Sequence, residues 1–162
     1  MSRIVVGVDG SAGAAVALAW AVEEARLRGS AVDAVHAWRL PLYAAAPEPW
    51  FVGMPELPHE LDAQVEAATE AHARDILDAA VAAAERESGD AGIEIRKEVV
   101  RGQAAHVLLE AARDADLLVV GSRGHGGFAG LLLGSVSQQC VQHASCPVVV
   151  VPAAPGADGG SG

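Results

Sequence analysis

The sequence predicts an α/β fold, an open five-stranded parallel sheet with strand order 3-2-1-4-5 and helices on both faces. Five short runs rich in valine, leucine and isoleucine alternate along the chain with alanine-rich helical patterns, and this alternation is typical of a parallel sheet covered on both faces. Right-handed crossovers restrict the strand order further. Apolar residues make up 51% of the chain and aromatic residues only 4%, so we expect a core of Ala, Val, Leu and Ile.

The first three elements are bounded by clear helix start and stop signals. Residues 3–9 form a short β-branched run that predicts a buried strand. Ser11 is placed to cap a helix over residues 12–28, which Gly29 ends. The run at 31–38 predicts a second strand.

A long irregular segment follows the second strand. Residues 39–58 contain five prolines and no stable period, so they predict a loop that is either a binding loop or a solvated excursion. Apolar residues at helical spacing then predict an amphipathic helix over 60–88. The alternation at 93–100 predicts a strand with one exposed face.

The last part of the domain repeats the alternation twice. A helix is expected over 103–113, followed by an unbroken apolar run at 116–120 that is typical of a central parallel strand. A helix over 135–144 and a last strand over 146–151 complete the sheet. We therefore expect one domain over residues 1–152 and a flexible tail of small residues over 153–162.

Charge and composition exclude several classes of partner. The formal net charge is −10 and Lys97 is the only lysine, which argues against binding nucleic acid or anionic membranes. No run of eighteen apolar residues occurs, and no signal-peptide pattern is evident at the start. Cys140 and Cys146 do not form a secreted disulfide framework. We expect a cytoplasmic protein, whose small anionic ligands would be held by backbone N–H groups.

The stretch "GSRGHGGFAGLLLGSVS" predicts the functional site. Its first fourteen residues contain six glycines, directly behind the fourth expected strand. Ligands of open α/β sheets bind beyond the carboxyl ends of the strands, where the strand order reverses. There "VDGS" at 8–11 and "GSRG" at 121–124 would open onto one crevice. A polyphosphate is expected to meet the N–H groups of Gly134, Ser135 and Val136 and the hydroxyls of Ser135 and Ser137.

Several side chains near this crevice allow two interpretations. Asp9 either binds ribose hydroxyls or Mg²⁺, or forms an Asx-type turn with Gly10. Arg123 either pairs with phosphate or lies at the loop surface. His125 is expected to be incidental and His36 to be packed and hydrogen-bonded.

Two other kinds of chemistry lack support in the sequence. Cys140, His143 and Cys146 lack a fourth ligand for zinc. Ser135 and Ser137 lack a His–Asp relay, so a nucleophilic role is not expected. The glycine stretch is not a P-loop, which requires a lysine beside the serine.

The spacing Gly121-x-x-Gly124, nine residues, then Gly134-Ser135 resembles the ATP-binding signature of universal stress proteins. "IVVGVDGS" and "CPVVVVP" are similar to that family's opening and closing strands, so the resemblance covers about residues 2–152. It implies a Rossmann-like fold of the adenine nucleotide alpha hydrolase type. It also implies that ATP is bound by Gly7, Asp9, Ala37, Val120, Gly121, Arg123, Gly124, Gly134, Ser135, Val136 and Ser137.

The resemblance further implies a homodimer formed through the last strand, at Val148, Val149, Val150 and Val151. An open apolar edge strand suits that role physically. We therefore expect a nucleotide-dependent regulatory module of the stress response that acts as a dimer. Because no general base is evident, hydrolysis would be weak at most. Two alternatives stay open, a slow ATPase or phosphoryl transferase on the same scaffold, and a nucleotide-free dimeric interaction protein.

Overall fold

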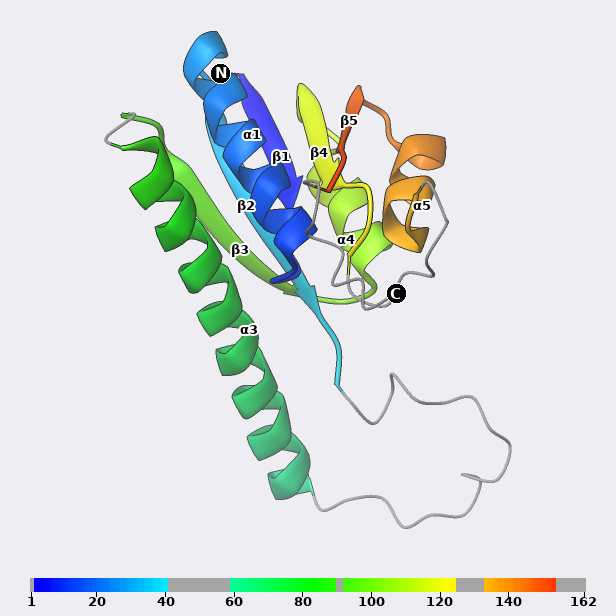
Figure 1. Cartoon of the computed structure of the whole chain (residues 1–162). Helices are drawn as coiled ribbons and strands as arrows, with labels where there is room; N and C mark the ends of the chain where they lie inside the picture. Colours follow the sequence, from blue (N-terminus) through cyan, green and yellow to red (C-terminus); the bar gives the residue numbers. More distant parts are fainter. Residues whose placement is uncertain (1, 41–58, 90–91, 125–132, 154–162) are drawn as a thin grey trace, which may run out of the picture.

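The computed structural model describes residues 2–40, 59–89, 92–124 and 133–153 (Figure 1). Within them, strands and helices alternate along the chain as the sequence predicts. The elements are β1 (Arg3–Gly7), α1 (Ala12–Arg28), β2 (Ala31–Trp38), α3 (His59–Ser88), β3 (Ile95–Arg101), α4 (Ala104–Ala111), β4 (Leu117–Gly121), α5 (Ser135–His143) and β5 (Val148–Val151).

The five strands form one parallel sheet in the order β3-β2-β1-β4-β5. This confirms the predicted fold class and strand order. Val5 of β1 is in register with Asp33 on one side and with Leu118 on the other. The strand order therefore reverses between β1 and β4, and the chain leaves these two neighbouring strands toward opposite faces of the sheet.

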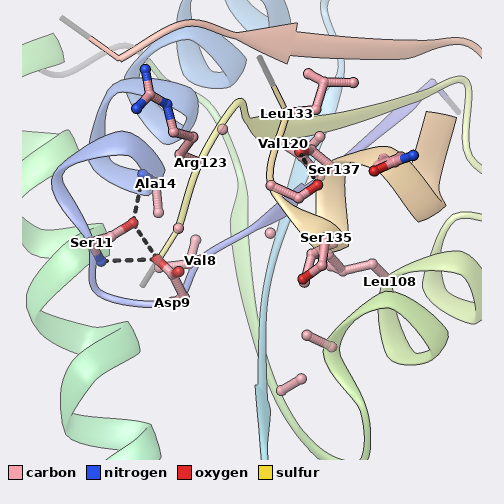
Figure 2. Close-up of a pocket in the computed structure, with 18 of the residues that line it drawn as sticks. Val8, Asp9, Ser11, Ala14, Leu108, Val120, Arg123, Leu133, Ser135 and Ser137 are labelled. Atoms are coloured by element: carbon pink, nitrogen blue, oxygen red, sulfur yellow. Dashed lines mark hydrogen bonds between the residues drawn. The ribbon is translucent and has the colours of Figure 1, made fainter. Parts of the chain in front are cut away.

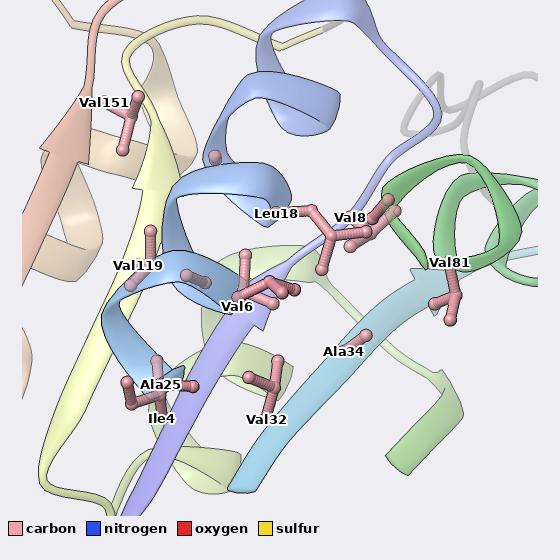
Figure 3. Packing of buried hydrophobic residues seen from close by; sticks show 14 of the residues in the cluster. Ile4, Val6, Val8, Leu18, Ala25, Val32, Ala34, Val81, Val119 and Val151 are labelled. Carbon is pink, nitrogen blue, oxygen red and sulfur yellow. The ribbon is translucent and has the colours of Figure 1, made fainter. Parts of the chain in front are cut away.

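Alternate residues of β1 supply two separate cores. Ile4, Val6 and Val8 pack under α1 and α3 together with Leu18 and Val81 (Figure 3). On the other face, a second cluster under α4 and α5 contains Val5, Val35, Val107, Leu108, Leu118 and Cys140. Because β1 and β4 are covered on both faces, their sequences are unbroken apolar runs rather than alternating ones.

The predicted element boundaries differ from the observed ones by one or two residues. β1 ends at Gly7 rather than at residue 9, because Asp9 already accepts a hydrogen bond from the backbone of Ser11. β5 begins at Val148 because Pro147 has no N–H to donate to the ladder. Gly29 adopts the left-handed conformation (φ 66°) and ends α1 as expected.

Some sequence predictions fall outside the described residues. They are most of the proline-rich segment 39–58, His125 with the loop up to residue 132, and the tail from residue 154. Within the described part of the chain, none of the helices combines the length and apolar character that crossing a lipid bilayer requires.

Candidate functional site

A pocket with a volume of about 410 Å³ opens at the carboxyl ends of β1, β2 and β4. It lies at the strand-order reversal, as expected for an open α/β sheet. Every residue that the sequence predicted as a nucleotide contact lines this one pocket. These residues are Gly7, Asp9, Ala37, Val120, Gly121, Arg123, Gly124, Gly134, Ser135, Val136 and Ser137.

The turn after β1 is organised by Asp9 (Figure 2). Its Oδ1 accepts hydrogen bonds from the Ser11 backbone N–H (2.9 Å) and from the Ser11 hydroxyl. The Ser11 Oγ in turn accepts from the Ala14 N–H at 3.2 Å and caps α1. The Asx-type turn considered for Asp9 is therefore present, and the same carboxylate also lines the pocket.

The segment that follows β4 approaches the segment that follows β1 closely at Gly124. A Cβ atom built at position 124 would collide with Oδ2 of Asp9. Any larger residue here would therefore displace the carboxylate that organises the β1 turn. This close approach gives a physical reason for glycine at the second position of the Gly-x-x-Gly motif.

At the entrance of α5, two groups expected to face a phosphate are used inside the protein. The Gly134 N–H donates to the Ser122 carbonyl oxygen at 2.6 Å. The Ser137 hydroxyl lies 3.0 Å from the carbonyl oxygens of both Ser122 and Gly134, and Ser137 is only 2% exposed. Both groups line the pocket, but their protons are directed at protein oxygens.

The remaining donors at this helix entrance come from its first turn. The first hydrogen bond within α5 runs from the Gln138 N–H to the Gly134 carbonyl at 3.0 Å. The N–H groups of Ser135, Val136 and Ser137 therefore have no acceptor inside the helix. They lie at the positive end of the α5 dipole, which favours an anion.

Arg123 comes from the segment that follows β4. Its side chain extends away from Ser135 and Ser137 in Figure 2, while its backbone passes along the pocket wall. In this conformation its guanidinium is not directed at the α5 entrance, and its Nε is buried. Both interpretations considered for Arg123 stay predictions.

Sequence reasoning missed part of the pocket wall. The entrance of α4 contributes Ala104 and Leu108, because every helix that follows a parallel strand begins at the same edge of the sheet. That signal was available from the predicted topology. Ala14, Val35, Leu133 and Gln138 were also missed, whereas Val8 and Ser11 belong to the segment 8–11 that was expected to open onto this crevice.

His36, Cys140 and Cys146 are not among the residues that line the pocket. His36 Nδ1 lies 2.6 Å from the Val8 carbonyl oxygen, as a packed histidine should. Both cysteines are free thiols, and burial raises the pKa of Cys140 to about 11. Within the described residues, no three His, Cys, Asp or Glu side chains are grouped so that they could hold a metal ion.

Comparison with known proteins identifies the family. The model of the universal stress protein family matches residues 1–152. The universal stress protein Rv2623 of Mycobacterium tuberculosis is 37% identical over 150 residues, which are 91% of this chain and 46% of that protein. The chain thus spans about half the length of the curated relatives it matches.

Solved structures share the fold. The universal stress protein UspA from Lactobacillus plantarum aligns with a TM-score of 0.71 at 24% identity, covering 93% of this chain and 97% of that one. A universal stress protein solved in complex with cAMP aligns with a TM-score of 0.56 at 26% identity, covering 94% and 98% of the two chains.

Proposed function

Since the chain belongs to the universal stress protein family, we propose that its pocket binds an adenine nucleotide, specifically ATP. The observation that carries this proposal is the convergence of the predicted contacts on one pocket at the strand-order reversal. Its volume of about 410 Å³ lies within the range of roughly 300–1,000 Å³ that is common for small-molecule sites. The cAMP complex of a relative in fold supports an adenine nucleotide as the ligand class.

The phosphates would lie at the entrance of α5. The first-turn N–H groups of Ser135 and Val136, together with the exposed Ser135 hydroxyl, are the donors directed there. Hydrogen bonds to charged groups contribute about 1.5–3 kcal/mol each, against an association cost of about 4–15 kcal/mol. A micromolar dissociation constant is the expected outcome.

The adenosine would occupy the apolar end of the pocket. Here the wall consists of small or apolar side chains on β2 and α4, with Ala37 and Leu108 among them. Small side chains leave room for a planar base, and the ends of β1 and β2 offer backbone groups that can pair with it. We therefore expect the base and the triphosphate to lie at opposite ends of the pocket.

Asp9 fits a magnesium ion that accompanies the triphosphate. Mg²⁺ in nucleotide sites is typically held by one or two carboxylates together with phosphate oxygens and water. Asp9 supplies one carboxylate to the pocket wall, and Ser11 fixes its orientation through Oδ1. The ion would offset phosphate charge in a chain whose own net charge is −10.

We expect the bound nucleotide to regulate the protein rather than to turn over rapidly. Asp9 is the single carboxylate among the described residues that line the pocket, and its Oδ1 is occupied by two hydrogen bonds. A homodimer formed through β5 would respond to the nucleotide state as a module of the stress response. The hydrolysis rate is expected to fall well below the usual enzyme range of about 1–10³ s⁻¹.

The proposal is tested by native mass spectrometry and calorimetric titration of the full chain. ATP should bind saturably and more tightly than AMP, because AMP leaves the α5 donors partly unused. Ser135→Ala should weaken ATP binding, while Ser145→Ala, which removes an exposed hydroxyl outside the pocket, should not. Absence of saturable binding by ATP, AMP and cAMP would overturn the proposal.

A further inference from the structure

We infer that Gly13 and Ser137 are positioning residues for the phosphate end of the pocket. They lie on different helices and hold the exit segment of β4 (residues 121–124) from two sides. Gly13 is not a pocket-lining residue, and Ser137 acts here through the protein rather than through the ligand. The inference rests on the nucleotide-binding function proposed above and names residues that set its geometry.

On one side, the exit segment of β4 touches the first turn of α1. A Cβ atom at Gly13 would lie 2.7 Å from the carbonyl oxygen of Arg123. A Cβ atom at Gly121 would likewise lie 3.1 Å from the carbonyl carbon and oxygen of Gly13. The two main chains are therefore in direct contact, and a side chain at position 13 has to move backbone atoms to be accommodated.

On the other side, the exit segment of β4 is bound to α5. The carbonyl oxygen of Ser122 accepts from the Gly134 N–H at 2.6 Å and from the Ser137 hydroxyl at 3.0 Å. Ser137 is buried, so water does not replace its hydroxyl easily. The Ser122 N–H donates to the Val151 carbonyl at 2.8 Å, which ties the same residue to β5.

These contacts connect α1 to the donors at the α5 entrance. A methyl group at position 13 forces the Arg123 carbonyl to move, and Arg123 directly follows Ser122 along the chain. The shift is therefore passed to Ser122 and to the first turn of α5 that Ser122 holds. Hydrogen bonds weaken steeply when donor and acceptor lose their alignment. We therefore expect the hydrogen bonds from the α5 entrance to the phosphates to weaken first.

Helix propensity makes the expected effect at Gly13 distinctive. Alanine is a better helix former than glycine, so Gly13→Ala should not destabilise α1 by propensity. A loss of phosphate binding in a variant with a well-formed helix would therefore reflect the displaced exit segment of β4. Ser137→Ala tests the α5 side, because it removes the hydroxyl and leaves the Gly134 N–H bond in place.

The experiment measures Kd for ATP and for adenosine by calorimetry, with circular dichroism to confirm folding. In Gly13→Ala and Ser137→Ala, the Kd for ATP should rise about tenfold or more, the loss of one hydrogen bond to a charged group. The Kd for adenosine, which has no phosphate, should not change. If the two residues had a purely structural role, the Kd values for ATP and for adenosine would rise in parallel.

Two control variants separate positioning from general destabilisation. Ala15→Gly lies on the exposed face of the same α1 turn and lowers helix propensity without touching the exit segment of β4. Ser145→Ala removes an exposed hydroxyl that is bonded to the Arg113 carbonyl. Both controls should keep the wild-type ratio of the two Kd values.

The possible outcomes are distinguishable. An unchanged ratio of Kd values in both Gly13→Ala and Ser137→Ala, or a parallel loss of adenosine binding, would overturn the inference while leaving the proposed function intact. If wild-type protein binds neither ligand, the proposed function fails and the inference fails with it.

Discussion

At the scale of single residues, Asp33 shows how the sheet carries a charge in its interior. Asp33 lies on β2 and is 2% exposed. Its Oδ2 is 3.0 Å from Arg3 Nη1 on β1, and its Oδ1 is 2.8 Å from Arg96 Nε on β3. The carboxylate therefore joins three adjacent strands, and its burial is compensated by two guanidinium groups that keep partial contact with water.

We predict that Asp33→Ala lowers the free energy of unfolding by about 1–3 kcal/mol, because it removes the hydrogen bond from Arg3 and the ion pair with Arg96 in a buried setting. The measurement is urea denaturation at neutral pH. Asp78→Ala is the control, since Asp78 pairs with Lys97 where both side chains are nearly half exposed and such pairs contribute about 0–1 kcal/mol. Equal losses in the two variants would contradict the prediction.

A second residue-scale prediction concerns Cys140 at high pH. Burial, with a smaller contribution from Cys146, raises the pKa of Cys140 from 9.0 to about 11. The unfolded chain therefore releases this proton before the folded protein does. The contribution of Cys140 to the free energy of unfolding is fully present below about pH 9. It is lost as the pH rises toward 11, by up to about 1.4 kcal/mol per pH unit.

Urea denaturation at several pH values between 8 and about 10.5 tests this sign. The free energy of unfolding of the wild type should fall more steeply with pH than that of Cys140→Ala. Tyrosine, lysine and other groups titrate in both proteins and cancel in the difference. A difference between the two proteins that stays constant over this range would show that the thiol is not shielded.

The positions of the site residues could be predicted from sequence, but the directions of their polar groups could not. Glycine spacing located Gly134 and Ser137 at the pocket. Nothing in the order of residues shows that the Ser122 carbonyl turns toward α5 and lies within hydrogen-bond distance of the Gly134 N–H and the Ser137 hydroxyl. The contact of Gly13 with Arg123 is equally hidden, because it joins backbones about a hundred residues apart along the chain.

At the scale of elements, the helices begin with unequal caps. Ser11 caps α1 through a hydrogen bond to the Ala14 N–H. Gln103 occupies the same position before α4, with extended backbone (φ −70°, ψ 131°) but no side-chain cap bond. Gln103 is exposed, and α4 has no acidic residue in its first turn.

We predict that Gln103→Asp raises the free energy of unfolding by about 0.5–1 kcal/mol, because aspartate caps a free N–H group and favours the helix dipole. Ser11→Ala should change it in the opposite direction, by about 0.5–2 kcal/mol. Thermal and urea unfolding measure both changes. A destabilised Gln103→Asp variant would show that the glutamine makes contacts that the cap does not replace.

Element types could be predicted well, whereas boundaries could not. Periodicity distinguishes the long amphipathic pattern of α3 from the apolar runs of β1 and β4. A helix or strand ends where its backbone hydrogen bonds end, and this depends on the neighbouring segments with which the backbone groups pair. α4, for example, ends at Ala111 rather than at residue 113, because the Arg113 N–H already bonds to the Glu110 carbonyl oxygen three residues back, in the turn that follows.

At the scale of the whole molecule, the two edges of the sheet differ in character. β3 exposes Arg96, Lys97 and Glu98, and charges of this kind oppose edge-to-edge pairing. β5 consists of four valines. The carbonyls of Pro147 and Val151 accept hydrogen bonds from the β4 side, so the alternation along a strand directs the backbone groups of Val148 and Val150 outward.

This geometry sharpens the proposal of a homodimer through β5. Val150→Pro removes an outward N–H and should give a folded monomer, because proline is tolerated on the open side of an edge strand. Val149→Pro removes an N–H that faces β4 and should destabilise the fold itself. Light scattering after size-exclusion chromatography, with circular dichroism, measures both; a Val150→Pro protein that stays dimeric would exclude pairing through β5.

The fold class and strand order could be predicted because alternation and crossover handedness leave few topologies. That topology has a consequence for biosynthesis. The central strand β1 is translated before the other strands of this sheet, yet Arg3 at its start bonds to Asp116, 113 residues later. Until β4 has been translated, one side of β1 has no partner, so the centre of the sheet stays incomplete and open to aggregation until residue 121 has been synthesised.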